Sequence, residues 1–337
     1  MNIIVRTTFI SAKPSNNGAS LVIHRRTRLT ARATRPRAAS VGAAMAVVAM
    51  LVTVTGCASG SSAGSGGSSD KIRVVASTNV YGDIVGRIGG DRVKVTSLIT
   101  NPDADPHSYQ ANVRNQVELA KAALIVENGG GYDDFVDTMR NAAHSTATVL
   151  NAVTISGEKA PAGGDLNEHV WYDFPAMTAL ATRIADALAT EDPAHAATFR
   201  ANAATFTADL DGLQKQEAAV RAAHAGAGVA ITEPVPLYLL TACGLVNRTP
   251  VEFSKAVEEE NDVPARVLLQ TLALFTDHRV RALVYNSQTS GPATERVLAA
   301  ARTNNIPVVP VTETLPDGQD YLSWMKANLA AVTAALS

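Results

Sequence analysis

The chain has 337 residues, of which 46% are hydrophobic and 18% are charged, and its formal net charge is −2. Residues 1–56 contain eight of the 29 basic residues and none of the 31 acidic ones, so the remainder holds 21 basic and 31 acidic residues, a formal net charge of −10. This negative charge argues against nucleic acid as a partner and is compatible with the attraction of cations.

The N-terminal segment has the pattern of an export signal. A basic stretch between Arg25 and Arg37 precedes an apolar run from Ala43 to Val54, and small residues lead into Cys57. The apolar run is shorter than the roughly 20 residues of a membrane-spanning helix, which is the alternative interpretation. We therefore predict a lipoprotein signal peptide over residues 1–56, lipidation of Cys57, and an extracytoplasmic protein anchored to the cell membrane.

Residues 57–70 are rich in Gly and Ser and predict a flexible tether. If Cys57 carries lipid, Cys243 is the one cysteine that remains, so no disulfide is expected. We predict that Cys243 is a small buried core residue, and a reactive thiol is the alternative.

After the tether, short apolar runs alternate with amphipathic stretches. The runs typical of strands are 72–76, 93–99, 123–126, 229–231, 282–285 and 307–311, and the helix-like stretches include 116–123, 136–143, 176–188 and 295–302. This alternation predicts an α/β fold with two similar lobes, each a mainly parallel sheet flanked by helices.

One stretch, 192–225, is rich in Ala and long polar side chains and predicts a single long helix. Asp192-Pro193 is a typical N-cap and first-turn pair, and Gly226 and Gly228 end the pattern. Such a helix would be roughly 48 Å long, and we interpret it as a rigid link between the lobes. The predicted domains are a first lobe over 71–191, the linking helix over 192–225 and a second lobe over 226–337, and a long surface helix within one domain is the alternative.

Four metal-capable side chains, His107, His169, Glu233 and Asp320, stand on loops that follow hydrophobic runs. Two imidazoles and two carboxylates suit a divalent transition metal, and ligands of open α/β sheets bind beyond the carboxyl ends of the strands. Each residue also has an ordinary interpretation, because Asp320 is a good N-cap and either histidine could be a loop or core residue. Glu313 and Asp317 compete with Asp320 for the fourth position.

Several motifs, in this order, resemble a known family. They are Asp105-Pro106-His107-Ser108-Tyr109, Glu127-Asn128-Gly129-Gly130, His169-Val170-Trp171-Tyr172-Asp173 and Asp320-Tyr321-Leu322-Ser323-Trp324-Met325. Residues 71–337 resemble the metal-binding solute-binding lipoproteins of ABC importers for zinc, manganese and iron (cluster A-I, adhesin-lipoprotein type). The resemblance implies one divalent ion as cargo between two lobes and its delivery to an ABC permease with a cytoplasmic ATPase. We expect a monomer.

The resemblance also assigns site residues. His107 and His169 match the ligands of the first lobe, and Asp320 is our match for the fourth ligand. Glu233 stands where zinc members usually have His, which favours manganese or iron and remains compatible with zinc. Asp105, Asp173 and Asn286 are candidates for holding the ligands by hydrogen bonds.

Two other functions remain open. In an exported metalloenzyme the metal would need an open position, whereas four protein ligands close this site and no His-Glu-x-x-His motif is present. We therefore expect no enzymatic activity. In a surface adhesin or structural lipoprotein the metal would only staple the lobes together, and removal of the metal by a chelator would then unfold the protein.

Overall fold

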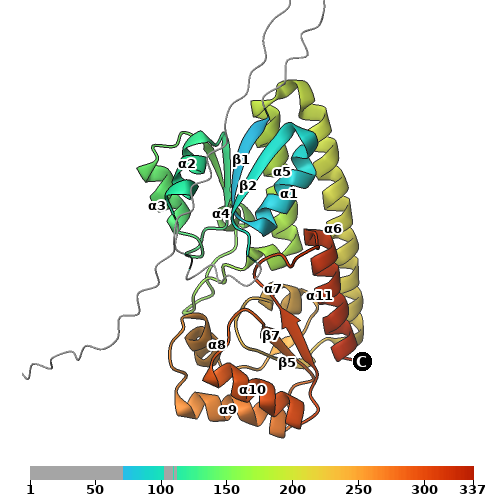
Figure 1. Cartoon of the computed structure of the whole chain (residues 1–337). Helices are drawn as coiled ribbons and strands as arrows, with labels where there is room; N and C mark the ends of the chain where they lie inside the picture. The colour runs from blue at the N-terminus through green and yellow to red at the C-terminus, as the bar shows by residue number, and fades with distance from the viewer. Residues whose placement is uncertain (1–70, 102–108, 110–111) are drawn as a thin grey trace, which may run out of the picture. The chain divides into compact units, whose positions relative to one another are not determined.

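Two four-stranded parallel sheets organise the part of the chain that the computed structural model describes, residues 71–101, 109 and 112–337. The first sheet has the order β2-β1-β3-β4 and the second the order β6-β5-β7-β8 (Figure 1). The strands of the first are β1 (Ile72–Thr78), β2 (Val93–Ile99), β3 (Leu124–Glu127) and β4 (Thr148–Asn151). Those of the second are β5 (Gly228–Ile231), β6 (Val246–Asn247), β7 (Leu283–Asn286) and β8 (Val308–Val311). The predicted α/β fold with two similar parallel-sheet lobes is confirmed.

The two sheets have the same topology. In each, the chain adds its second strand on one side of its first strand and then crosses to add the third and fourth strands on the other side. The direction in which the chain adds strands therefore reverses beside β1 in the first sheet and beside β5 in the second. Parallel α/β sheets bind ligands in the crevice beyond the carboxyl ends of the strands at such a reversal.

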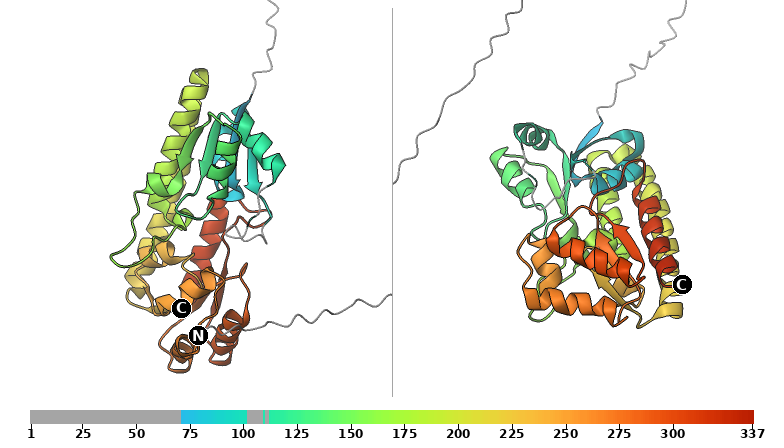
Figure 2. Two further views of the ribbon diagram at one scale, coloured as in Figure 1. Left: turned by 90° about the vertical axis from the view of Figure 1, so that its left-hand side faces the viewer. Right: turned by 60° about the horizontal axis from the view of Figure 1, so that its bottom comes forward.

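Helices cover both faces of the first sheet. The α-helices α1 (Asn79–Gly89) and α5 (Phe174–Glu191) lie on one face, and α2 (Val113–Lys121) and α3 (Phe135–Ala142) lie on the other (Figures 1 and 2). Successive residues of β1 alternate between these faces, because Val74 packs in the main core whereas Val75 packs with Leu119 and Val136. The short helix α4 (Ala152–Ser156) follows β4.

The second sheet has its own set of helices. They are α7 (Leu237–Ala242), α8 (Val251–Glu258), α9 (Ala265–Thr276) and α10 (Pro292–Thr303). Figure 2 shows α9 and α10 side by side on the same side of this sheet. Val267, Phe275 and Val297 from these two helices form a buried cluster with Leu283 of β7.

The long helix α6 (Ala196–His224) connects the two lobes. Its 29 residues span about 44 Å. Near its start Asn202 donates to the carbonyl oxygen of Ile88 (2.9 Å), and near its end Arg221 donates to the carbonyl oxygen of Ala242 (2.8 Å). The helix therefore contacts elements of both lobes. The buried residues Phe199, Ala203, Phe206, Leu210, Leu213 and Val220 recur at spacings of three, four or seven and form one stripe along it.

The start of α6 differs from the prediction. A 3₁₀ turn, Pro193–His195, precedes the helix, and the Asp192 side chain accepts no hydrogen bond from the backbone of that turn. Its carboxylate instead binds the Arg92 guanidinium (2.7 Å) and lies 2.9 Å from Nδ1 of His195. The Asp192 side chain thus joins the end of α5 to Arg92, just before β2, and does not cap α6.

The last helix, α11 (Tyr321–Ala335), lies along α6 (Figure 1). Tyr321 donates to the carbonyl oxygen of Trp171 (2.6 Å), and its ring centroid is 5.9 Å from that of Phe206. The chain therefore returns from the second sheet to pack against the first lobe, and one main hydrophobic core includes residues of both sheets. The boundaries 71–191, 192–225 and 226–337 stay predictions.

The predicted signal peptide, the tether and Cys57 lie outside the described residues. Within the described part of the chain, no helix is both long enough and apolar enough to cross a membrane. Cys243 is a fully buried free cysteine at the end of α7, as predicted.

Candidate metal centre

Three polar side chains meet where neighbouring strands of the second sheet end. Glu233 follows β5, Asn286 is the last residue of β7, and Glu313 follows β8. All three are at most 3% exposed. Because the strands are parallel and adjacent, their carboxyl ends meet at one edge, which is the edge where this fold binds ligands.

The Asn286 amide holds the two carboxylates. Its Nδ2 donates to Oε1 of Glu313 (2.8 Å) and to Oε2 of Glu233. The backbone N–H of Asn286 donates to Oγ1 of Thr232 (2.9 Å), which fixes the amide at the strand end. A neutral amide can donate to two carboxylates without neutralising either of them. The amide can therefore orient both carboxylates without adding a charge of its own.

His169 is fully buried and precedes the 3₁₀ turn Val170–Tyr172. Its Nδ1 lies 2.7 Å from Oδ1 of Asn167, and the same oxygen accepts the backbone N–H of His169 (3.2 Å). An amide oxygen can only accept, so Nδ1 carries the proton and donates. In the neutral ring Nε2 then carries the lone pair that a metal requires.

Asn167 is itself fixed by the second lobe. Its Nδ2 donates to the carbonyl oxygen of Pro234 (3.2 Å), and its own carbonyl oxygen accepts from the Tyr238 hydroxyl (2.7 Å). Pro234 directly follows Glu233, so the residue that orients the imidazole is tied to the loop that carries a carboxylate of the site.

Two carboxylates approach Nε2 of His169. Oε2 of Glu313 lies 4.0 Å away, and Oε1 of Glu258, at the end of α8, lies 3.8 Å away. Two ligand atoms that share one metal at about 2.1 Å stand about 3.4 Å apart in tetrahedral geometry. Small side-chain shifts would therefore let a cation join His169 to either carboxylate.

The negative charges in this cluster act on one another. Burial, followed by the negative charges of Glu168, Glu233 and Glu313, raises the pKa of Glu258 to about 9. A divalent cation among these groups would favour their ionised forms. The donor set of one imidazole and several carboxylates therefore fits a divalent transition metal.

Glu313, and not Asp320, stands beside Nε2 of His169. Asp320 is the N-cap of α11, where its Oδ1 accepts the backbone N–H of Ser323 (2.8 Å) and its Oδ2 pairs with Arg87 (3.1 Å). Its side chain is 43% exposed. The Ser323 hydrogen bonds and the Arg87 charge lower the pKa of this carboxyl. The Asp-Tyr pair at the start of the last helix is thus a capping signal.

The other predicted positions divide into two groups. His107 and Asp105 lie outside the described residues, and nearby Tyr109 donates to the carbonyl oxygen of Leu98 (3.2 Å) near the end of β2. Asp173 stands at the N-terminus of α5, where burial and then the negative charge of Glu158 raise its pKa to about 6. The hydrogen bond to the His169 ring, for which Asp173 was a candidate, comes from Asn167 instead.

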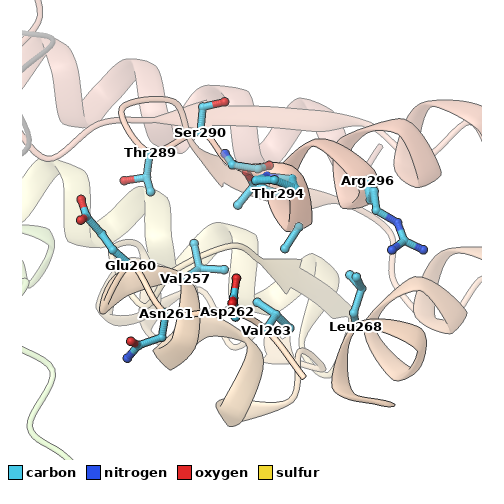
Figure 3. Close-up of a pocket in the computed structure, with 13 residues that line it drawn as sticks. Val257, Glu260, Asn261, Asp262, Val263, Leu268, Thr289, Ser290, Thr294 and Arg296 are labelled. Carbon is cyan, nitrogen blue, oxygen red and sulfur yellow. The ribbon is translucent and has the colours of Figure 1, made fainter. Parts of the chain in front are cut away.

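Of the three cavities whose linings include residues of α8, two also include Glu260. One, of about 410 Å³, is lined by residues of the α8–α9 connection and the start of α10, among them Glu260, Asp262, Thr289 and Arg296 (Figure 3). It contains none of the predicted ligands. The other, of about 570 Å³, is lined by Gly130, Asp165, Leu166, Glu168, Lys255, Glu258, Glu259 and Glu260. This acidic cavity lies beside His169, because Glu258 lines it and its Oε1 stands 3.8 Å from Nε2 of His169.

Comparison with known proteins places the chain in a family. Residues 74–335 match the sequence profile of the family described as zinc-uptake complex component A, periplasmic (ZnuA). The chain belongs to this family. The resemblance drawn from the motifs is thereby confirmed, and the family is one of solute-binding proteins rather than enzymes.

Individual relatives are distant. The chain is 31% identical to the manganese-binding lipoprotein MntA of Bacillus subtilis over 183 residues, which cover 52% of this chain and 57% of MntA. It is 24% identical to the manganese ABC transporter substrate-binding lipoprotein scaA of Streptococcus gordonii over 86% of this chain and 98% of scaA. A crystal structure of ZnuA superposes with a TM-score of 0.69 at 22% identity, covering 80% of this chain and all of that one, which shows a shared fold.

The hydrogen bonds from Asn286 to Glu233 and Glu313 lead to a first prediction. Asn286→Ala should weaken metal binding by about 10–100-fold, because Glu233 and Glu313 would then repel each other without the amide that orients them. Titration of the metal against a chelating dye would measure the change. Asn304→Ala is the matched control, because Asn304 makes only a local bond to Ala300 within α10. Equal metal affinities for Asn286→Ala and the unchanged protein would show that Asn286 does not position the two carboxylates for the metal.

Proposed function

We propose that this protein binds one divalent transition metal outside the cytoplasm and delivers it to an ABC permease driven by a cytoplasmic ATPase. The observation that carries the proposal is the fully buried imidazole of His169 facing the carboxylates of a parallel-sheet edge. Family membership supports it, and the curated relatives MntA and scaA are described as manganese-binding and as manganese transporter lipoproteins.

His107, His169, Glu233 and Glu313 form the proposed ligand set. His107 enters it from the motif match alone, and Glu313 replaces Asp320 because of its distance from Nε2 of His169. Carboxylates are hard ligands, so this set favours manganese or ferrous iron over zinc in relative terms. Zinc still binds most such sites more tightly than manganese, so metal supply would decide the loading in the cell.

The remaining parts of the proposal concern the protein's place at the membrane. Lipidation of Cys57 and the tether over 57–70 would hold the two lobes beside the permease, and the relative scaA is named a lipoprotein. We propose a monomeric carrier. An adhesin in which the metal only staples the lobes, and an exported metalloenzyme, are the alternatives.

Competitive loading tests the proposed function. The full chain, stripped of metal and offered manganese, ferrous iron and zinc, should hold one equivalent by elemental analysis. His169→Ala should lose that equivalent, because no other group within the described residues places an imidazole nitrogen among these carboxylates. His195→Ala is the matched control, since His195 is a partly exposed histidine in the turn before α6.

Retention of one full equivalent by His169→Ala would refute the site. Chelation separates the carrier from the stapled adhesin, because a carrier should release metal and keep its circular dichroism spectrum, whereas a stapled fold should unfold.

A further inference from the structure

A second set of metal-capable side chains shares His169 with the proposed centre. These side chains are Glu168, His169 and Glu258. Each offers one ligand atom, and the three ligand atoms lie within 4.8 Å of one another. In the described part of the chain this is the one group of three or more such residues that meets this spacing, and Glu313 does not belong to it. Glu258 and Glu313 both stand near Nε2 of this imidazole, at 3.8 and 4.0 Å.

The two sets differ in their access to solvent. Glu233 and Glu313 are 3% and 2% exposed and share the Asn286 amide. The Glu258 side chain is 18% exposed, and Glu168 and Glu258 both line the acidic cavity of about 570 Å³. A cation that comes from solvent through this cavity would therefore meet Glu168 and Glu258 before it meets the inner pair.

The composition of the cavity also favours a cation. Its lining includes five carboxylates and a single ammonium, that of Lys255, which pairs with Asp165 and lies 3.7 Å from Glu259. Glu168 and Glu258 are not among the partners of this ammonium. A cleft lined by one sign of charge raises the local concentration of counter-ions and their rate of association.

From these observations we propose that Glu168, His169 and Glu258 form an outer metal position that receives the cation and passes it to an inner position formed by His169, Glu233 and Glu313. This inference rests on the proposed function. Nε2 of His169 carries one lone pair, so the imidazole binds one ion at a time and the chain still holds one metal.

The transfer keeps the charge of the ion balanced. Each position offers two carboxylates to a dication, Glu168 with Glu258 outside and Glu233 with Glu313 inside. Nε2 stays bound while Glu168 and Glu258 are exchanged for Glu233 and Glu313, so two coordination bonds break and two form. The ion is thus never buried without counter-charges, a state that would be strongly unfavourable.

Stopped-flow kinetics with manganese and a chelating dye test this proposal on the full chain. Glu258→Gln, which keeps the side chain's shape, should slow both association and dissociation about tenfold. The dissociation constant should change by no more than about threefold, because the inner position remains intact. Glu260→Gln is the matched control, since it makes the same substitution at an exposed glutamate that lines the same cavity. Glu258→Asp should restore part of the rate.

Two results would overturn the outer position. If Glu258→Gln slows binding no more than Glu260→Gln does, the ion does not pass through Glu258. If it raises the dissociation constant without slowing association, Glu258 is a permanent ligand rather than a loading group. Failure of the unchanged protein to bind any metal is a distinct result, which refutes the proposed function and with it this inference.

Discussion

Glu313→Gln is expected to weaken metal binding by about 100-fold or more, because loss of a group that only supports a ligand already lowers affinity about 10–100-fold. The substitution removes the negative charge of a carboxylate that is 2% exposed and stands 4.0 Å from Nε2 of His169. It keeps the volume of the side chain, so the fold should remain intact. A competition titration against a chelator of known affinity would measure the loss.

Asp320→Asn is the matched comparison, because it makes the same chemical change in the other candidate for the fourth position. Asn is as good an N-cap as Asp, and the lost contact with Arg87 is a partly exposed ion pair. Metal affinity should therefore change by less than about threefold. If Asp320→Asn abolished binding while Glu313→Gln retained it, the fourth ligand would be Asp320 after all.

Phe206→Ala is expected to lower the free energy of unfolding by about 3–5 kcal/mol, as for other buried phenylalanines. Phe206 is 1% exposed and lies on the buried stripe of α6, where its ring meets Tyr321 of α11. The cavity would open where the linking helix joins the last helix to the core. Urea denaturation followed by far-ultraviolet circular dichroism would give the change.

Thr205→Ala serves as the control for this change, because Thr205 is exposed on the same turn of α6. Its unfolding free energy should stay within about 0.5 kcal/mol of the unchanged protein. A loss below about 1 kcal/mol for Phe206→Ala would mean that the surrounding core closes over the cavity or that the α6–α11 contact contributes little.

Strands with long apolar runs could be predicted closely from the sequence. The run 93–99 coincides with β2, and the run 229–231 lacks only Gly228 of β5. The strands β4 and β6 were missed, since one is mostly half-exposed and the other has two residues. The helix α1 was missed because it follows β1 without a turn, so its apolar residues continue those of the strand.

The candidate site was only partly visible in the sequence. The sequence marks Glu233 and Asn286 because they stand at the ends of hydrophobic runs, and His169 because of the motif around it. The sequence favours Asp320 over Glu313, because an Asp that caps a helix and an Asp that binds a metal are the same residue type. Asn167 and Glu258 carried no signal, since an Asn two residues before a histidine and a Glu at the end of a helix are both ordinary.

The sequence by itself determined the fold class, the family and the chemical type of the site, because periodicity and short motifs are local properties of the chain. Only the tertiary structure decided which side chains meet. Parallel strands bring Glu233, Asn286 and Glu313 to one edge over gaps of 53 and 27 residues. The backbone N–H of Ser323 and the Arg87 guanidinium hold the Asp320 carboxylate at the N-terminus of α11. Metal ligation depends on distances of a few ångströms between such residues, and these are fixed by strand order and packing.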